Sequence, residues 1–514
     1  MSTLTALARA QAVATGRAQP IATVRHLHVH DHPLVLIPLV MAGEANAPLA
    51  AMVGTDPARP RLLVVGQPRN RDERFAFAAE LAATLVDYVD SFTDATEDVA
   101  VDRGKDVRQR YVDAPQIWVP NPAGADFLRL FGRSTRFRRT DGDNPVPAAV
   151  PLLGRWLTFF ANTAEVPGSS LLVNAVQALG LHWVTGQSSA EDAQFGVQLA
   201  WIESGAGAAR EAENGPVAGP ATDPDFDNRV LAPLIERSAP ELPSVLHDLL
   251  LPTWERMWRT LGLLRRLPVG ERVRLRWDAD RDAFTAFAQN LAEGGPPQPR
   301  RDGAVAAAAR LQRLESAASR YAVQRAFDDP LVLAEYRLSG AAFAGVVTLA
   351  NPDRVDDSGK RPVLRPRIMV RTTEPVRVEP GVSLTSPARP AQKARVVSIS
   401  PDGDVLLELS GGMGRRLVAE PGSVPAVGER LVLTTLSEAY RPGGTLPDPA
   451  ETPWTHGGPP VPFDPSAQPD QPSGQSDQPS AQPDQEEGDV VAPSRGDLQE
   501  PGAELVTGVG RVLP

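Results

Sequence analysis

Pro33-Leu-Val-Leu-Ile-Pro-Leu-Val-Met41 is the run of sequence that decides the fold of the first part of the chain. It is too short for a membrane-spanning helix, which needs about 20 apolar residues. A brief apolar run of this kind, flanked by turn-forming residues, predicts a buried strand. We therefore expect a mixed α/β region around it.

The segments on either side extend this pattern over residues 1–144. Further strands are expected over 24–30, 49–53, 61–65 and 116–119. Apolar residues recur every three or four positions from Phe75 to Phe92, which predicts a helix, and Asn70 or Asp72 is suited to cap its start. Residues 1–144 are therefore predicted to form a mixed α/β domain.

Residues 145–330 have the apolar period of helices. Helices are expected over 152–160, 171–183, 190–202, 228–236, 245–264, 280–291 and 302–327. The sequence predicts a helical middle domain.

The period changes to two in residues 331–441. Strands are expected over 367–371, 375–378, 394–400, 405–409 and 430–436. Asp402-Gly403 lies between two of these strands, and Asp-Gly favours a tight hairpin because it adopts positive φ readily. This region is predicted to be a small β-barrel.

Residues 442–514 are rich in proline, glycine, serine, glutamine and acidic residues, and are predicted to be a disordered acidic tail. From Leu446 onward we count 12 of the 63 acidic residues but only two of the 52 basic ones, so the rest of the chain is nearly neutral. The apolar stretch 503–513 is either a docking motif for a protein partner or a frayed end.

Composition excludes several classes of site. The 514 residues include no cysteine, which rules out disulfides, thiolate nucleophiles and cysteine zinc sites and fits the cytoplasm. The first twenty residues lack a signal-peptide core and no run spans a bilayer, so we expect a cytoplasmic protein with no membrane partner. All but three of the basic residues are arginine, which reflects either high-GC codon bias or selection for phosphate contact.

His26-Leu-His-Val-His-Asp-His32 holds four of the seven histidines. On a strand, His26, His28 and His30 would project from one face, where neighbouring imidazoles can converge on a metal ion. The stretch resembles the metallo-β-lactamase motif His-x-His-x-Asp-His but does not match it. Asp31 follows His30 directly, without the intervening residue. The alternatives are a metal site and a solvated strand edge.

The chain shows no Walker A, Gly-x-Ser-x-Gly, His-Glu-x-x-His or Gly-x-Gly-x-x-Gly motif. Gly411-Gly-Met-Gly-Arg-Arg416 lacks the Lys-Ser/Thr ending of a phosphate loop and is interpreted as a loop between barrel strands. We expect no catalytic residues and no cofactor.

Two basic clusters are the candidate nucleic-acid-binding sites. The first comprises Arg133, Arg136, Arg138 and Arg139, and the second comprises Arg365, Arg367, Arg371, Arg415 and Arg416. The first is interleaved with aromatic residues, and guanidinium groups beside aromatic rings suit phosphate contact and base stacking. The alternative for each cluster is a solvated face balanced by carboxylates.

The predicted barrel carries a resemblance to a known family. Gly381-Val-Ser-Leu-Thr385, Ala394-Arg-Val-Val-Ser-Ile399 and Val405-Leu-Leu-Glu-Leu409 resemble the accessory β-barrel of Upf1-like superfamily-1 helicases. The likeness covers under a quarter of the chain and includes no ATPase motif. It implies an accessory subunit that acts with a separate helicase or ATPase. The whole chain also resembles a family of proteins from high-GC bacteria, which implies no activity.

Three functions follow from the sequence. The first is a non-enzymatic accessory or scaffold protein that binds nucleic acid or a nucleic-acid-processing partner such as a helicase. The second is a metal-dependent hydrolase built on the cluster His26–His32. The third is a structural assembly subunit. The first and third share the expectation that ionisable side chains are scattered and that no deep cleft joins the early imidazoles to distant carboxylates, whereas the second requires such a site.

Overall fold

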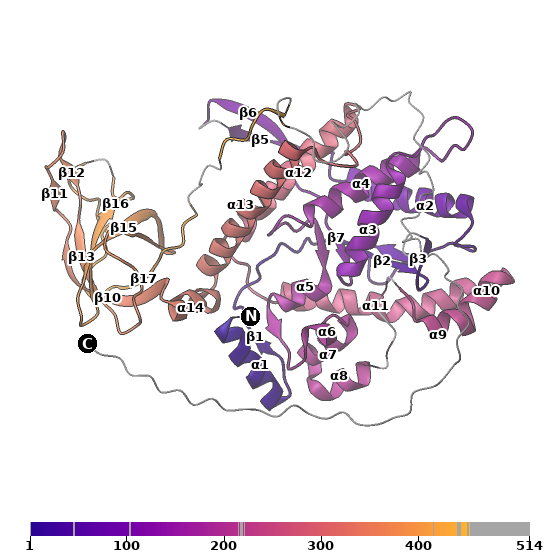
Figure 1. Ribbon diagram of the computed structural model, residues 1–514, viewed down its shortest axis with the longest axis horizontal. Coiled ribbons are helices and arrows are strands. Elements are labelled where there is room, and N and C mark those ends of the chain that lie inside the picture. Colours follow the sequence, from indigo (N-terminus) through magenta and orange to yellow (C-terminus); the bar gives the residue numbers. More distant parts are fainter. Residues whose placement is uncertain are drawn as a thin grey trace, which may run out of the picture. The chain divides into compact units, whose positions relative to one another are not determined.

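The computed structural model describes residues 2–44, 47–101, 104–213, 215, 219, 221–414, 416–438, 444–449 and 452. It contains helices, open sheets and a closed barrel, so the expected α+β class is confirmed (Figure 1). The predicted tail falls almost entirely outside the described residues. None of the described helices is long and apolar enough to cross a bilayer.

A five-stranded sheet forms the centre of the first region. Its strands, in spatial order, are β4 (Arg61–Val64), β3 (Pro48–Gly54), β2 (Leu34–Val40), β7 (Ile117–Val119) and β8 (Leu172–Asn174). β2, β3 and β4 are antiparallel, whereas β2, β7 and β8 run parallel. Every residue of β2 is buried, as its apolar sequence predicts for a strand covered on both faces.

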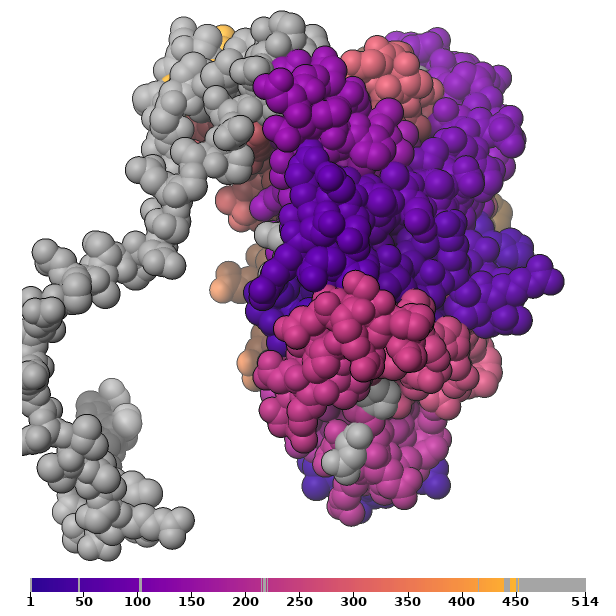
Figure 2. Space-filling model, turned by 90° about the vertical axis from the view of Figure 1, so that its right-hand side faces the viewer, coloured from indigo at the N-terminus to yellow at the C-terminus, as the bar shows by residue number. Residues whose placement is uncertain are grey.

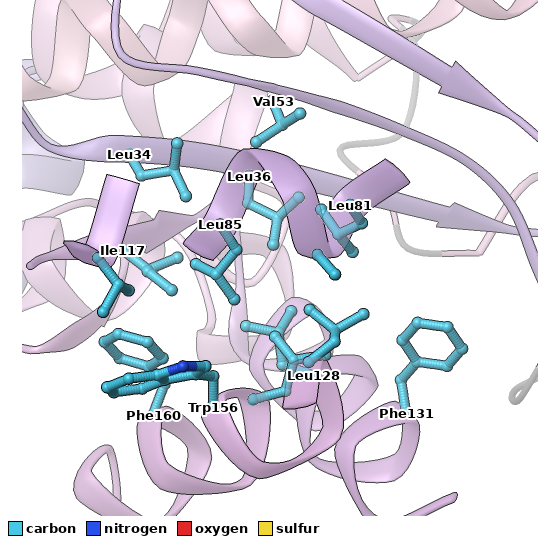
Figure 3. Packing of buried hydrophobic residues seen from close by; sticks show 14 of the residues in the cluster. Leu34, Leu36, Val53, Leu81, Leu85, Ile117, Leu128, Phe131, Trp156 and Phe160 are labelled. Carbon is cyan, nitrogen blue, oxygen red and sulfur yellow. The ribbon is translucent and has the colours of Figure 1, made fainter. Parts of the chain in front are cut away.

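Three helices pack on one face of this sheet. They are α2 (Arg71–Asp90), α3 (Pro122–Thr135) and α4 (Ala149–Thr163), all drawn on the same side of the strands in Figure 1. Leu34 and Leu36 of β2 contact their buried side chains, among them Leu81, Leu128 and Trp156 (Figure 3). The side chain of Asn70 accepts hydrogen bonds from the main-chain N–H groups of the first turn of α2, which confirms the predicted cap.

The intervening β2 residues face the opposite way. Val35 and Ile37 pack with Trp118 against a second layer of helices, which includes α5 (Ala175–Gly180), α7 (Phe195–Ser204) and α11 (Leu242–Arg265). Both buried clusters therefore combine residues from before and after position 144, and the sheet itself extends to Asn174. Figure 2 shows the same continuity on the surface, where the violet early residues adjoin the pink residues around 200–260.

The remaining described elements that precede the barrel lie outside the five-stranded sheet. They are α1 (Thr3–Thr15), β1 (Gln19–Pro20) paired with β9 (Trp183–Val184), the hairpin β5 (Thr96–Val101) and β6 (Asp106–Tyr111), α6 (Ser189–Asp192), α8 (Ala206–Ala212), α9 (Pro224–Phe226), the π-helical turn η2 (Asp227–Leu231), α10 (Ala232–Glu236), α12 (Val273–Ala292), α13 (Ala304–Asp328) and α14 (Pro330–Ser339).

The predicted barrel is confirmed as a closed, six-stranded, antiparallel barrel. Its strands, in order around the barrel, are β10 (Ala342–Asn351), β13 (Arg367–Arg371), β16 (Asp404–Ser410), β15 (Arg389–Ile399), β14 (Ser383–Ser386) and β17 (Arg430–Thr434), and β11 (Val355–Asp356) pairs with β12 (Val363–Leu364) beside it. Val405, Leu407 and Leu409 alternate into its core. Gly403 has a φ of 82°, and a Cβ there would lie 2.4 Å from the carbonyl oxygen of Thr372, so the turn requires glycine.

Several local predictions were wrong. Residues 24–30 form no strand of any sheet, and 375–378 form none either. The segment 171–183, expected to be one helix, contains β8, α5 and the start of β9. A strand of three residues is too short to show a period of two, and Asn174 ends it by capping α5 through its side chain. The strands β10 and β14 were not predicted.

Candidate nucleic-acid interface

The first basic cluster lies at the C-terminal end of α3. This end packs closely on α4 because glycines stand at the crossing: a Cβ at Gly154 would lie 2.2 Å from the main-chain nitrogen of Arg136, and one at Gly132 would lie 2.9 Å from that of Thr158. Arg133 is exposed in the last helical turn, where a cation also suits the negative end of the helix. The glycines therefore determine the position of the arginines at the end of α3.

The fold adds arginines from two distant segments. The pKa of Arg136 is lowered to about 10, by burial and by the neighbouring guanidinium groups of Arg133 and Arg300. The pKa of Arg138 is likewise lowered by burial, and then by three neighbouring arginines, which are Arg71, Arg74 and Arg300. We call the six residues Arg71, Arg74, Arg133, Arg136, Arg138 and Arg300 the arginine cluster. It joins the start of α2, the end of α3 and the loop before α13.

Main-chain carbonyl groups hold three of the six guanidinium groups of the cluster in place. Arg71 donates to the carbonyl oxygen of Asn144 at 2.8 Å, and Arg138 donates to that of Ser134 at 3.0 Å. Arg136, which is buried, donates to two carbonyl oxygens in the loop before α13, those of Gln298 at 2.9 Å and Pro299 at 3.0 Å. A carbonyl acceptor fixes a guanidinium group without cancelling its charge.

Carboxylates contribute little to this surface. Arg71 pairs with the exposed Asp72 at 2.8 Å, and no other member of the cluster forms an ion pair within the part of the chain that the structure describes. The cluster therefore concentrates positive charge with one ion-paired carboxylate among the described residues. Such a surface attracts polyanions.

Two aromatic rings lie among these arginines. The guanidinium carbon atoms of Arg71 and Arg138 are 4.8 and 5.5 Å from the centre of the Phe75 ring. Those of Arg136 and Arg300 are 4.8 and 5.0 Å from the centre of the Phe137 ring. Cation–π contacts of this kind stabilise the arginines in one arrangement.

Arg139 stands apart from the cluster although the sequence groups it with Arg138. Its Nε donates to Asp141 at 2.9 Å, and this pairing raises the pKa of Arg139 and lowers that of Asp141. Arg139 thus has its own counter-charge.

Carboxylates also balance the second predicted cluster, on the barrel. Arg367 and Arg371 on β13 lie directly opposite Glu408 and Asp404 on β16. Arg367 lies 3.1 Å from Glu408, which Arg354 also contacts, and Arg371 lies 2.8 Å from Asp404. The cross-strand register therefore brings opposite charges together.

The other arginines of the barrel prediction have different surroundings. Arg365 donates to the carbonyl oxygen of Leu364 at 3.1 Å, and Arg416 is exposed. Arg415 lies outside the described residues.

The three histidines of the metal prediction have separate environments. His26 lies 3.2 Å from Asp329, with both side chains fully buried, and stacks on His182. His28 stacks on Trp277 with ring centres 3.9 Å apart, and burial is the main reason that its pKa is lowered to about 4.

His30 forms a second imidazole–carboxylate pair, since its Nε2 lies 3.1 Å from Asp113. Two of the early imidazoles therefore each meet one distant carboxylate. The two pairs do not converge. Among the described residues, no three histidine, aspartate or glutamate side chains gather as metal ligands would.

Side chains of other elements satisfy the main chain of this histidine segment, which explains why it forms no strand. The N–H groups of His26, His28 and His30 donate respectively to side chains of His182, Ser170 and Gln116. Their carbonyl oxygens accept respectively from side chains of Arg276, Gln116 and Arg265. The segment is stabilised by these contacts instead of a neighbouring strand.

A cavity of about 780 Å³ lies beside β8, the edge strand of the sheet. Its walls include the apolar side chains of Leu172, Val176 and Leu181, and His26 borders it. The walls contain none of the six residues of the arginine cluster.

Sequence reasoning found three of the six cluster members and missed Arg71, Arg74 and Arg300. A signal for them is present, because basic residues recur just before Phe75 and just after the Gly-Pro break at 294–297. The acidic residues Asp72 and Glu73 interrupt the first of these runs and hide its positive charge in any local count.

Comparison of the chain with known proteins found no family model, no curated protein and no solved structure that matches it.

Proposed function

We propose that the protein is a non-enzymatic accessory or scaffold protein that binds nucleic acid through the arginine cluster. The observation that carries this proposal is the gathering of six guanidinium groups from three segments far apart in the sequence. Only one of the six, that of Arg71, forms an ion pair with a carboxylate among the described residues. Guanidinium groups this close repel one another, and a phosphate backbone relieves that repulsion. Phosphate contacts of arginine supply most of the sequence-independent affinity of proteins for nucleic acid.

The same proposal includes a cytoplasmic location and a separate helicase or ATPase as the partner. The likeness of the barrel segments to the accessory barrel of Upf1-like helicases supports that partner. In this interpretation the arginine cluster holds the nucleic acid while the partner supplies the ATPase. A protein partner bound through residues 503–513 belongs to the same proposal, and that segment lies outside the described residues.

Binding of a fluorescein-labelled nucleic acid to the full chain, followed by fluorescence anisotropy between 50 and 200 mM salt, tests the proposal. Substitution of Arg74, Arg133 and Arg138 by glutamine should weaken binding about a hundredfold near 100 mM salt. The slope of log affinity against log salt should fall by about three, one for each phosphate contact removed.

A matched variant controls for net charge. Arg59, Arg229 and Arg259 are exposed and each pairs with a carboxylate, so their triple substitution by glutamine changes the net charge equally. This variant should bind within about threefold of the unmodified protein, because ion-paired surface arginines contribute little. Equal losses in the two triple variants would contradict a specific role for the cluster.

A further inference from the structure

We infer that the arginine cluster recognises the sugar–phosphate backbone of a double helix and discriminates against single strands. This inference rests on the proposed function and adds the class of nucleic acid. The observations behind it are the occupied rings of Phe75 and Phe137 and the fixed guanidinium groups around them.

Proteins that bind single strands use exposed aromatic rings as platforms on which bases stack. The two aromatic rings that lie among the arginines of the cluster, Phe75 and Phe137, are instead half-buried. Each has two guanidinium groups within 5.5 Å of its centre. A base could stack on either ring only by displacing arginines from it.

The displaced arginines would also lose their hydrogen bonds. Freeing Phe75 breaks the bonds from Arg71 to Asn144 and from Arg138 to Ser134. Freeing Phe137 breaks those from Arg136 to the loop before α13. Stacking on these rings therefore costs contacts that hold the surface together, whereas phosphate contact leaves them intact.

The distribution of charge agrees with backbone contact. Single-strand sites combine stacking with a basic groove that follows the strand. The large cavity beside β8 has none of the cluster in its walls, so it supplies no such groove to these arginines. Guanidinium groups held on three separate segments instead suit the regularly spaced phosphates of a duplex.

The test compares three labelled probes with the full chain: a 20-base-pair DNA duplex, an RNA duplex of the same length, and a 20-nucleotide oligo(dT). We expect at least one duplex to bind about tenfold more tightly than oligo(dT) at 100 mM salt. The two duplex arms show whether B-form or A-form geometry is preferred. Oligo(dT) bound as tightly as both duplexes would overturn the inference and leave the proposed function standing.

Two variants test the rings directly. Phe75→Leu and Phe137→Leu, made together, keep apolar bulk but remove both the stacking surface and the cation–π contacts to the arginines, and should weaken oligo(dT) binding no more than duplex binding. A loss of oligo(dT) binding tenfold greater than the loss of duplex binding in this variant would contradict the inference. If no probe binds the unmodified chain more tightly than it binds the triple variant of Arg74, Arg133 and Arg138, the proposed function and the inference both fail. The probe comparison on the unmodified chain needs no variant, so a folding defect cannot obscure it.

Discussion

The arginine cluster and the barrel strand β13 use the same side chain in opposite ways. On β13, Arg367 and Arg371 face carboxylates across the strand pair, and their charges are balanced within the barrel. In the cluster, carbonyl oxygens hold Arg136 and Arg138, so no carboxylate among the described residues cancels their charges. The comparison teaches that the partner of an arginine, and not the local density of arginine, decides whether a basic segment can bind an anion.

The largest expected effect concerns the stability of the two regions. Arg136→Ala leaves the carbonyl oxygens of Gln298 and Pro299 without their donor, and should lower the free energy of unfolding by about 2–4 kcal/mol. Arg367→Ala should cost about 1 kcal/mol or less, because its ion pair with Glu408 is partly exposed. Scanning calorimetry of both variants measures the difference, and equal losses would contradict the assignment of Arg136 to a buried network.

A second prediction concerns the two carboxylates that balance the arginines of the barrel. Asp404→Asn with Glu408→Gln removes the partners of Arg371, Arg367 and Arg354, and should raise affinity for duplex DNA by about tenfold at low salt. Anisotropy measures the gain. Asp353→Asn with Glu379→Gln removes two exposed carboxylates without ion pairs in the described residues and is the matched control. A gain in duplex affinity no larger than that of the control would contradict the claim that these carboxylates keep the barrel arginines from binding an anion.

Removing the barrel arginines should have a smaller effect. Arg367→Gln with Arg371→Gln is expected to weaken duplex binding by less than about threefold, since their charges are already offset by Glu408 and Asp404. The same anisotropy titration applies. If this double variant loses as much affinity as the triple variant of the cluster, the barrel belongs to the binding surface as well.

The smallest expected effect is that of pH. The lowered pKa of Arg136 is still about 10, so this guanidinium keeps its proton below that value and loses it only as the pH rises through 10. Duplex affinity should therefore change by less than about twofold between pH 7 and pH 9. Titrations at constant ionic strength measure it, and a tenfold fall over this interval would show that another group controls binding.

Much of the local structure was predictable. Asn70 caps α2 as predicted, and the apolar residues of α2 recur at the predicted helical spacing. Both features could be predicted because they depend only on neighbours along one helix. The hairpin at Gly403 and the inward residues Val405 and Leu407 followed from turn chemistry and a period of two. β8 could not be predicted, because its three residues are a strand only through pairing with β7.

The candidate site was predictable in part. The run from Arg133 to Arg138 is visible in the sequence, but Arg71 and Arg300 join it only through packing of α2 and the loop before α13. The balancing of the Arg371 charge by Asp404 is equally hidden, since Asp404 lies 33 positions away and meets Arg371 through strand register.

By itself, the sequence determined the composition of this protein, its helical and strand periods, its capping and turn residues, and the order of its parts. Those properties depend on interactions between residues that are close along the chain. Only the tertiary structure decided which charges are cancelled and which remain. His26 meets Asp329, Arg367 meets Glu408 and Arg138 meets Arg71 because packing and register place distant residues within the few ångströms over which charges interact strongly.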